Sequence, residues 1–115
     1  MDKHAFIHRL RAICGENIIA DEPQLKVYET DGLTAKRRAP WLVVLPSSVK
    51  EVQQVVKLCF DAEVPLVARG AGTGLSGGAL PHADGVLLIL AKLKRILSVD
   101  TENRLATVEP GVTNL

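Results

Sequence analysis

The chain has 115 residues and a formal net charge of +1, and 47 % of its residues are hydrophobic but only 3 % aromatic. This length suits one domain with a modest core. The near-neutral charge and the scarcity of aromatic side chains exclude a nucleic-acid-binding protein, because such a surface needs clustered positive charge or stacking platforms.

The amino-terminal segment predicts a helix over residues 3–14. Asp2 is suited to cap its start and Gly15 to end it. The apolar residues recur at helical spacing on one face, and they are Phe6, Ile7, Leu10, Ile13 and Cys14.

No metal site is predicted in this helix. His4 and His8 lie four residues apart, but no third ligand is nearby, so we interpret them as part of a solvated face. Residues 16–40 are expected to be irregular, with short extended pieces at 18–19 and 25–28.

A strand, a helix and a second strand are predicted next. The apolar run at residues 41–45 is typical of a buried strand. Ser48 and Glu51 form a capping box that opens a helix running to about Glu63. Its expected apolar face comprises Val52, Val55, Val56, Cys59 and Phe60. Because residues 66–68 follow as another apolar strand after a short joint, the pattern predicts a parallel βαβ unit.

The last third of the chain predicts a further strand and a hairpin. Residues 85–90 form a third apolar run, and residues 91–95 suit a single helical turn. Residues 96–99 and 105–109 flank the Asp- and Asn-containing turn at 100–104. We therefore predict an α+β fold: a small, mostly parallel sheet with a βαβ unit, plus a β-hairpin.

The two cysteines predict the redox environment. Cys14 and Cys59 fall on the apolar sides of their helices, which favours buried, reduced thiols. A disulfide between them is the alternative that the sequence leaves open. The longest apolar run, residues 86–91, is too short to span a bilayer, and the amino terminus lacks the apolar core of a signal peptide. We expect a cytoplasmic protein.

The densest motif is the glycine-rich stretch that follows the strand at 66–68. Its five glycines are Gly70, Gly72, Gly74, Gly77 and Gly78. Without side chains, such a stretch exposes a row of backbone N–H groups, which bind anions well. Thr73 and Ser76 add hydroxyl donors, and Arg69 adds positive charge. We hypothesise that this stretch binds a diphosphate.

Other glycine-rich sites fit this stretch less well. The spacing Gly72-x-Gly74-x-x-Gly77 matches the dinucleotide fingerprint, but no helix can begin there with Pro81 and Gly85 so close. The stretch is not a Walker loop, because it lacks the Lys-Ser/Thr that such a loop requires. A kinase site would use Lys92, but the chain has no kinase catalytic-loop motif. A plain glycine-rich surface loop stays open.

The motifs resemble the flavin-binding domain of the vanillyl-alcohol oxidase type, also called the PCMH type. The matching segments are residues 65–79 (PLVARGAGTGLSGGA), 84–88 and 108–112, and residues 31–33 and 42–46 also match. The resemblance covers nearly the whole chain from about Ala20, and the helix before it matches more weakly. Within that group the chain is most similar to the glycolate oxidase D subunits and their D-lactate dehydrogenase relatives. The resemblance implies the first subdomain of a PCMH-type FAD-binding domain.

The domain expectation follows from this resemblance. Residues 1–40 are expected to form an amino-terminal helix and an irregular lead-in, and residues 41–115 the amino-terminal part of the FAD-binding domain. Because the chain ends where a new element begins after Pro110 and Gly111, we expect a fragment of a longer protein.

The resemblance also implies the cofactor and the residues that bind it. FAD would place its pyrophosphate on the backbone between Arg69 and Ser76. Because Thr73 stands where some members carry a flavin-tethering histidine, non-covalent FAD is expected. The implied cofactor-binding residues are Pro46, Arg69, Gly70, Ala71, Gly72, Thr73, Gly74, Leu75, Ser76, Gly77, Gly78, Pro110, Gly111 and Val112.

In the full-length relatives, a 2-hydroxy acid such as glycolate or D-lactate gives a hydride to the flavin. We assign no catalytic residue and no metal ligand to this chain, because His82 lies in a proline-flanked loop and is interpreted as solvated. The resemblance implies an inactive fragment of a flavin-dependent dehydrogenase or oxidase. It also implies partner subunits of a glycolate oxidase complex, which would associate a cytoplasmic protein with the membrane.

Two alternatives remain at this point. One is another flavoenzyme of the same fold, such as an alkyl-glycerone-phosphate synthase or a sugar-lactone oxidase. The other is a non-catalytic binding module that has kept the fold. The isolated chain is also expected to self-associate through exposed strand edges.

Overall fold

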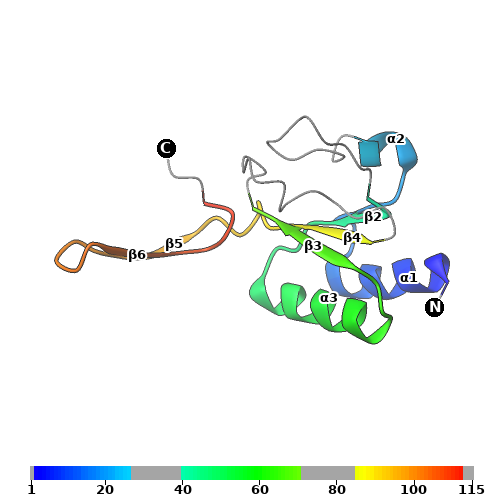
Figure 1. The fold of residues 1–115 in the computed structure, drawn as a ribbon, viewed down its shortest axis with the longest axis horizontal. Coiled ribbons are helices and arrows are strands. Elements are labelled where there is room, and N and C mark those ends of the chain that lie inside the picture. The colour runs from blue at the N-terminus through cyan, green and yellow to red at the C-terminus, as the bar shows by residue number, and fades with distance from the viewer. Residues whose placement is uncertain (1, 27–39, 71–84, 113–115) are drawn as a thin grey trace.

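The computed structural model describes residues 2–26, 40–70 and 85–112. Figure 1 shows a small mixed sheet with helices on both of its faces and a hairpin that projects away from it. The predicted α+β arrangement, with a mostly parallel sheet, a βαβ unit and a hairpin, is confirmed. In sequence order the strands are β1 (Ile18–Ile19), β2 (Leu42–Val44), β3 (Leu66–Arg69), β4 (Val86–Ile89), β5 (Ile96–Asp100) and β6 (Leu105–Val108).

The first helix, α1 (Lys3–Cys14), forms as predicted. The Asp2 carboxylate accepts a hydrogen bond from the Ala5 N–H at 2.8 Å, which satisfies one of the free donors at the helix start. Gly15 ends the helix with φ of 61°, a backbone conformation that favours glycine, and its N–H donates to the Arg11 carbonyl. The local sequence therefore sets both ends of α1.

The expected extended piece at residues 25–28 is wrong at Leu25. A short helix, α2 (Glu22–Leu25), occupies this position, with a proline in its first turn. Proline fixes φ near the helical value and lacks only an N–H that a first turn leaves unbonded, so it favours a helix start here. Leu25 thereby turns inward and is buried. Val27 and Tyr28 lie outside the described residues.

The sheet has the strand order β1-β2-β4-β3. β4 is parallel to both β2 and β3, and all four of its residues are buried. β1 pairs antiparallel with β2 at the edge. The chain therefore runs from β2 through α3 to β3, and β4 then enters between them.

The second long helix, α3 (Val49–Asp61), begins at the predicted capping box. The Ser48 hydroxyl accepts from the Glu51 N–H at 3.2 Å, and the Glu51 carboxylate accepts from the Ser47 hydroxyl at 2.9 Å. The helix ends at Asp61, two residues before the predicted end at Glu63. At Glu63 φ is 55°, so the backbone there has left the helical region.

The predicted apolar face of α3 is partly wrong. Val55 and Cys59 are buried as expected, and so is Leu58, which the prediction omitted. Phe60 is 83 % exposed and Val56 is 42 % exposed. Successive residues are rotated by about 100° around the helix axis. Because Leu58 and Cys59 lie on the buried face, Phe60 points to the solvent.

Two apolar clusters lie on the two faces of the sheet. The larger one packs α1 and α3 against side chains of β2 and β4, and includes Phe6, Leu10, Leu42, Val55 and Leu88. The smaller one lies on the opposite face, beneath α2, and contains Leu25, Val43, Leu87 and Ile89. Alternate residues of β2 and β4 thus serve alternate faces, as the pleat of a strand requires.

Both cysteines are free and buried in the larger cluster, as predicted. Burial raises the pKa of Cys14 and of Cys59 to about 11, and the neighbouring Glu51 carboxylate adds to the shift at Cys14. Only the thiolate reacts with alkylating agents, so both groups are protected chemically as well as sterically.

We expect both thiols to be alkylated by iodoacetamide at pH 8 about a hundredfold more slowly in the native chain than in urea, because the native thiolate fraction is that much smaller. Mass spectrometry of quenched samples measures the two rates. Equal native and denatured rates would contradict the packing of α1 and α3 on the sheet.

The predicted hairpin forms from β5 and β6 and stands apart from the main sheet, as Figure 1 shows. Asp100 accepts hydrogen bonds from the N–H and the side-chain amide of Asn103 in its turn. The register pairs Ile96 with Val108 and Val99 with Ala106, so these four residues share one face. This apolar hairpin face is exposed, with Val99 at 65 %.

Among the described residues, no helix has the length and hydropathy needed to cross a membrane.

Candidate functional site

The parallel strands β2, β3 and β4 all end at the same edge of the sheet. Pro46 follows β2, Gly70 follows β3 and Leu90 follows β4. In open sheets of this kind, ligands bind beyond the carboxyl ends of the strands. We take this carboxyl edge as the candidate site.

A chain of backbone hydrogen bonds builds the carboxyl edge. The Leu90 N–H donates to the Arg69 carbonyl at 2.8 Å, and the Leu93 N–H donates to the Leu90 carbonyl at 3.0 Å. The Gly111 N–H donates to the Leu93 carbonyl at 2.8 Å. These bonds hold the segment that follows the hairpin against the ends of β3 and β4. The helical turn predicted at residues 91–95 is wrong, because residues 91–92 form a hydrogen-bonded turn instead.

The structure brings together two segments that the sequence predicted to bind the cofactor. A Cβ atom added to Gly70 would lie 2.7 Å from the Pro110 carbonyl oxygen. One added to Gly111 would lie 2.4 Å from the Leu90 oxygen and 2.8 Å from the Leu93 oxygen. Real Cβ atoms do not approach oxygen so closely, so glycine is required at both positions for the backbones to meet.

The other predicted residues divide into described and undescribed ones. Pro46 is fully buried and Arg69 is 7 % exposed, so both pack into the carboxyl edge. Val112 is half-buried and donates its N–H to the Glu109 carbonyl at 3.2 Å. Outside the described residues lie Ala71, Gly72, Thr73, Gly74, Leu75, Ser76, Gly77 and Gly78, together with His82.

An ion pair that the sequence prediction missed lies beside this edge. Glu109 accepts hydrogen bonds from the Arg95 N–H at 2.9 Å, from its Nε at 3.1 Å and from its Nη2 at 3.2 Å. The Arg95 guanidinium and backbone N–H hold the pKa of the Glu109 carboxyl below its usual range. Counting from the turn could not find this pair, because a register irregularity between Ile96 and Ser98 shifts the pairing by one residue. This shift brings Glu109 opposite Arg95, whose carbonyl accepts the Glu109 N–H.

A cavity of about 410 Å³ adjoins this ion pair at the start of α3. It is lined by Ser47, Ser48, Val49, Lys92, Arg95 and Glu109. The Lys92 ammonium donates to the Asn17 side-chain oxygen at 2.7 Å. Because Arg95 neutralises the carboxylate that lines this cavity, the hydroxyl and cationic groups around it suit an anionic group.

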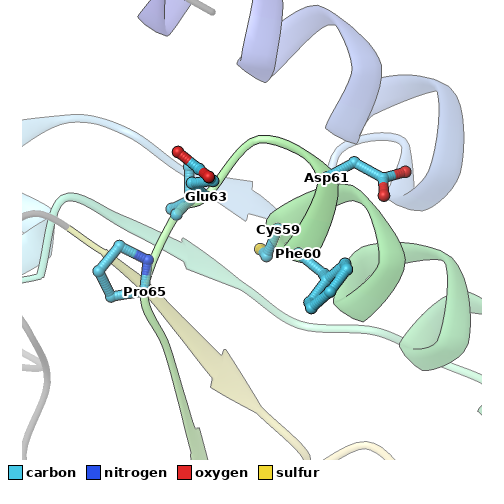
Figure 2. Close-up of a pocket in the computed structure, with 6 residues that line it drawn as sticks. Cys59, Phe60, Asp61, Glu63 and Pro65 are labelled. Atoms are coloured by element: carbon cyan, nitrogen blue, oxygen red, sulfur yellow. The ribbon is translucent and has the colours of Figure 1, made fainter.

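A second cavity, of about 620 Å³, lies at the opposite edge of the sheet, between the end of α3 and the start of β3. Figure 2 shows that Phe60, Asp61 and Glu63 point in different directions there. Within residues 2–26, 40–70 and 85–112, no group of three acidic, histidine or cysteine side chains is arranged to hold a metal ion. This second cavity therefore offers no converging chemistry.

Comparison with known proteins supplies the family. A family described as FAD binding domain matches residues 40–115. The chain is 45 % identical, over all of its length, to the glycolate oxidase subunit GlcD of Escherichia coli strain K12, and covers 23 % of that protein. It is 43 % identical over 74 % of its length to the D-lactate dehydrogenase of Archaeoglobus fulgidus, and covers 19 % of it.

A solved structure supports the same fold. The structure of p-cresol methylhydroxylase with substrate bound matches 96 % of this chain with a TM-score of 0.79 and 30 % identity, over 22 % of its own length. The chain thus spans less than a quarter of the length of each of these three proteins. Since the family match extends over more than half of the chain, the chain belongs to the FAD-binding-domain family, and its cofactor is FAD.

Proposed function

We propose that this chain carries the first part of the FAD-binding domain of a flavin-dependent 2-hydroxy acid dehydrogenase or oxidase that acts on glycolate or D-lactate. The observation that carries the proposal is the meeting of Gly70 and Pro110 at the carboxyl edge. Its substrate class rests on the similarity to a glycolate oxidase subunit and a D-lactate dehydrogenase.

The carboxyl edge fits the phosphate half of FAD in the chemistry of its groups. Arg69 and Lys92 supply positive charge, and the Glu109 charge is neutralised by Arg95. We propose that the backbone from Arg69 to Ser76 holds the diphosphate, that Gly77 and Gly78 line the cofactor path, and that residues 110–112 face the flavin. Pro46 is proposed to lie toward the adenine half.

The mode of FAD binding and the domain limits are part of the proposal. FAD is proposed to be held without a covalent bond, because Thr73 offers no histidine nitrogen. The binding domain is proposed to begin at residue 41, after a lead-in of residues 1–40, although α1 shares the larger core with the sheet.

When bound, FAD supplies the acceptor for the hydride that a 2-hydroxy acid gives up. The contribution of this chain is to orient the cofactor and to balance its phosphate charge. We assign it no catalytic residue, so the group that takes the hydroxyl proton is proposed to lie outside this sequence.

The partners and location are proposed from the same relatives. The protein is proposed to work with partner subunits of a glycolate oxidase complex, in the cytoplasm or at a membrane that those subunits reach. The isolated chain is proposed to self-associate through its exposed strand edges. The apolar hairpin face, formed by Ile96, Val99, Ala106 and Val108, adds exposed apolar surface that favours the same association.

The proposal is tested with Gly70→Ala in the longest natural polypeptide that contains this chain. The new Cβ would overlap the Pro110 oxygen and displace the start of the glycine-rich stretch, so we expect FAD to bind about tenfold more weakly. Titration of apoprotein with FAD, followed by protein fluorescence, gives the dissociation constants.

Gly15→Ala is the matched control, because a Cβ there meets nothing within 4 Å and Gly15 lies in α1's cap, away from the carboxyl edge. Its FAD affinity should be unchanged. Unaltered FAD binding by Gly70→Ala would contradict the assigned site. A wild-type protein that reduces its flavin with phenols and not with glycolate or D-lactate would contradict the substrate class.

A further inference from the structure

The root of the hairpin is closed by backbone and side-chain bonds between the same two residues. The Glu109 N–H donates to the Arg95 carbonyl at 2.9 Å, while the Glu109 carboxylate receives the Arg95 N–H and guanidinium. The Glu109 side chain is 7 % exposed and that of Arg95 is 75 % exposed. The carboxylate is therefore the fixed half of the pair, and the arginine covers it from the solvent side.

The residues that follow Glu109 are those that meet the glycine-rich stretch. The carbonyl of Pro110 lies against Gly70, and Gly111 is fitted between the oxygens of Leu90 and Leu93. The Glu109 carbonyl also accepts the Val112 N–H. A shift of the Glu109 backbone therefore moves residues 110–112, the segment that lies against Gly70.

We propose that Arg95 and Glu109 are positioning residues for FAD: their pairing fixes the segment 110–112 against Gly70 and so sets the start of the diphosphate-binding backbone. This inference rests on the proposed function of the carboxyl edge. The pair touches no reacting atom, and it acts through the backbone of Pro110 and Gly111.

The charges of the pair explain why a carboxylate is tolerated beside a phosphate site. An unpaired Glu109 would repel the diphosphate, whereas two hydrogen bonds from the guanidinium neutralise it and hold it in one orientation. Arginine also suits this role better than lysine, because its planar fork bonds both carboxylate oxygens.

The test compares Glu109→Ala with Asp100→Ala in the longest natural polypeptide that contains this chain. Asp100 is a matched control, because its carboxylate also accepts hydrogen bonds within the hairpin, from the N–H and side-chain amide of Asn103 at the distant turn. We expect Glu109→Ala to weaken FAD binding about tenfold and to change the visible circular dichroism of the bound flavin. Asp100→Ala should alter neither.

Two further variants separate geometry from charge and from misfolding. Glu109→Gln keeps an oxygen that accepts from the Arg95 N–H and Nε, so it should restore most of the affinity and the flavin spectrum. Arg95→Ala removes a mostly exposed side chain and spares the core, and it should weaken FAD binding in the same direction as Glu109→Ala.

The outcomes distinguish this inference from the proposed function. If Glu109→Ala and Arg95→Ala only lower the melting temperature and leave FAD affinity and the flavin spectrum like those of Asp100→Ala, the pair is merely structural and the inference is overturned. If the wild-type protein itself takes up no FAD, the proposed function fails and the inference fails with it.

Discussion

Replacing Phe6 with alanine is expected to lower the free energy of unfolding by about 3–5 kcal/mol. Phe6 is fully buried between α1 and the sheet, and its ring centroid lies 5.5 Å from the ring centroid of Trp41. Truncation leaves a cavity that the helix and the sheet can fill only in part. Urea denaturation followed by tryptophan fluorescence measures the loss.

Phe60→Ala is the control for this prediction. It deletes the same atoms from the same chain, but Phe60 is 83 % exposed, so the free energy of unfolding should change by less than about 0.5 kcal/mol. Similar losses for both variants would show that α1 does not pack on the sheet as described. The pair thus tests whether the amino-terminal helix is an integral part of the core.

Replacing Gly85 with alanine is expected to cost about 2–3 kcal/mol by overpacking. A Cβ at this position would lie 2.4 Å from the Pro65 carbonyl oxygen. That oxygen accepts the Val86 N–H, and the Gly85 oxygen accepts from the Trp41 N–H. The starts of β2, β3 and β4 therefore converge on Gly85, and a side chain there would force β3 from β4. Thermal unfolding measures the loss.

Gly15→Ala again provides the comparison, for a different reason. Space is free around Gly15, and only its φ of 61° opposes a side chain, so we expect a cost of about 1 kcal/mol. Should Gly85→Ala prove no more harmful than Gly15→Ala, the close approach of β3 and β4 at Pro65 would be wrong.

Local signals in the sequence predicted most of the elements. Asp2 and Gly15 fixed the ends of α1 because a cap and a left-handed stop act within one turn of the helix. Ser48 and Glu51 did the same for α3. The hairpin turn was predictable because Asp100 and Asn103 bond within the turn itself.

Features that depend on tertiary packing were predicted less well. The exposure of Phe60 depends on how α3 is rotated on the sheet, and hydrophobicity alone placed it inside. Leu25 was taken as extended, although the preceding proline starts a short helix that buries it. The contact of Gly70 with Pro110 joins residues forty positions apart, and only the family resemblance predicted that they lie near one site.

The strand order also constrains how the protein folds. β2 and β3 precede β4 in the chain, but β4 lies between them in the sheet. No parallel pair of the native sheet can therefore form until β4, which begins at residue 86, has been synthesised and has entered between them. Such long-range pairing must overcome a large loop-closure entropy before it gains any contact, which makes folding slow. During synthesis on the ribosome, the edges of β2 and β3 that will pair with β4 therefore stay unpaired after α3 has been made. The nascent chain is most exposed to aggregation during this interval.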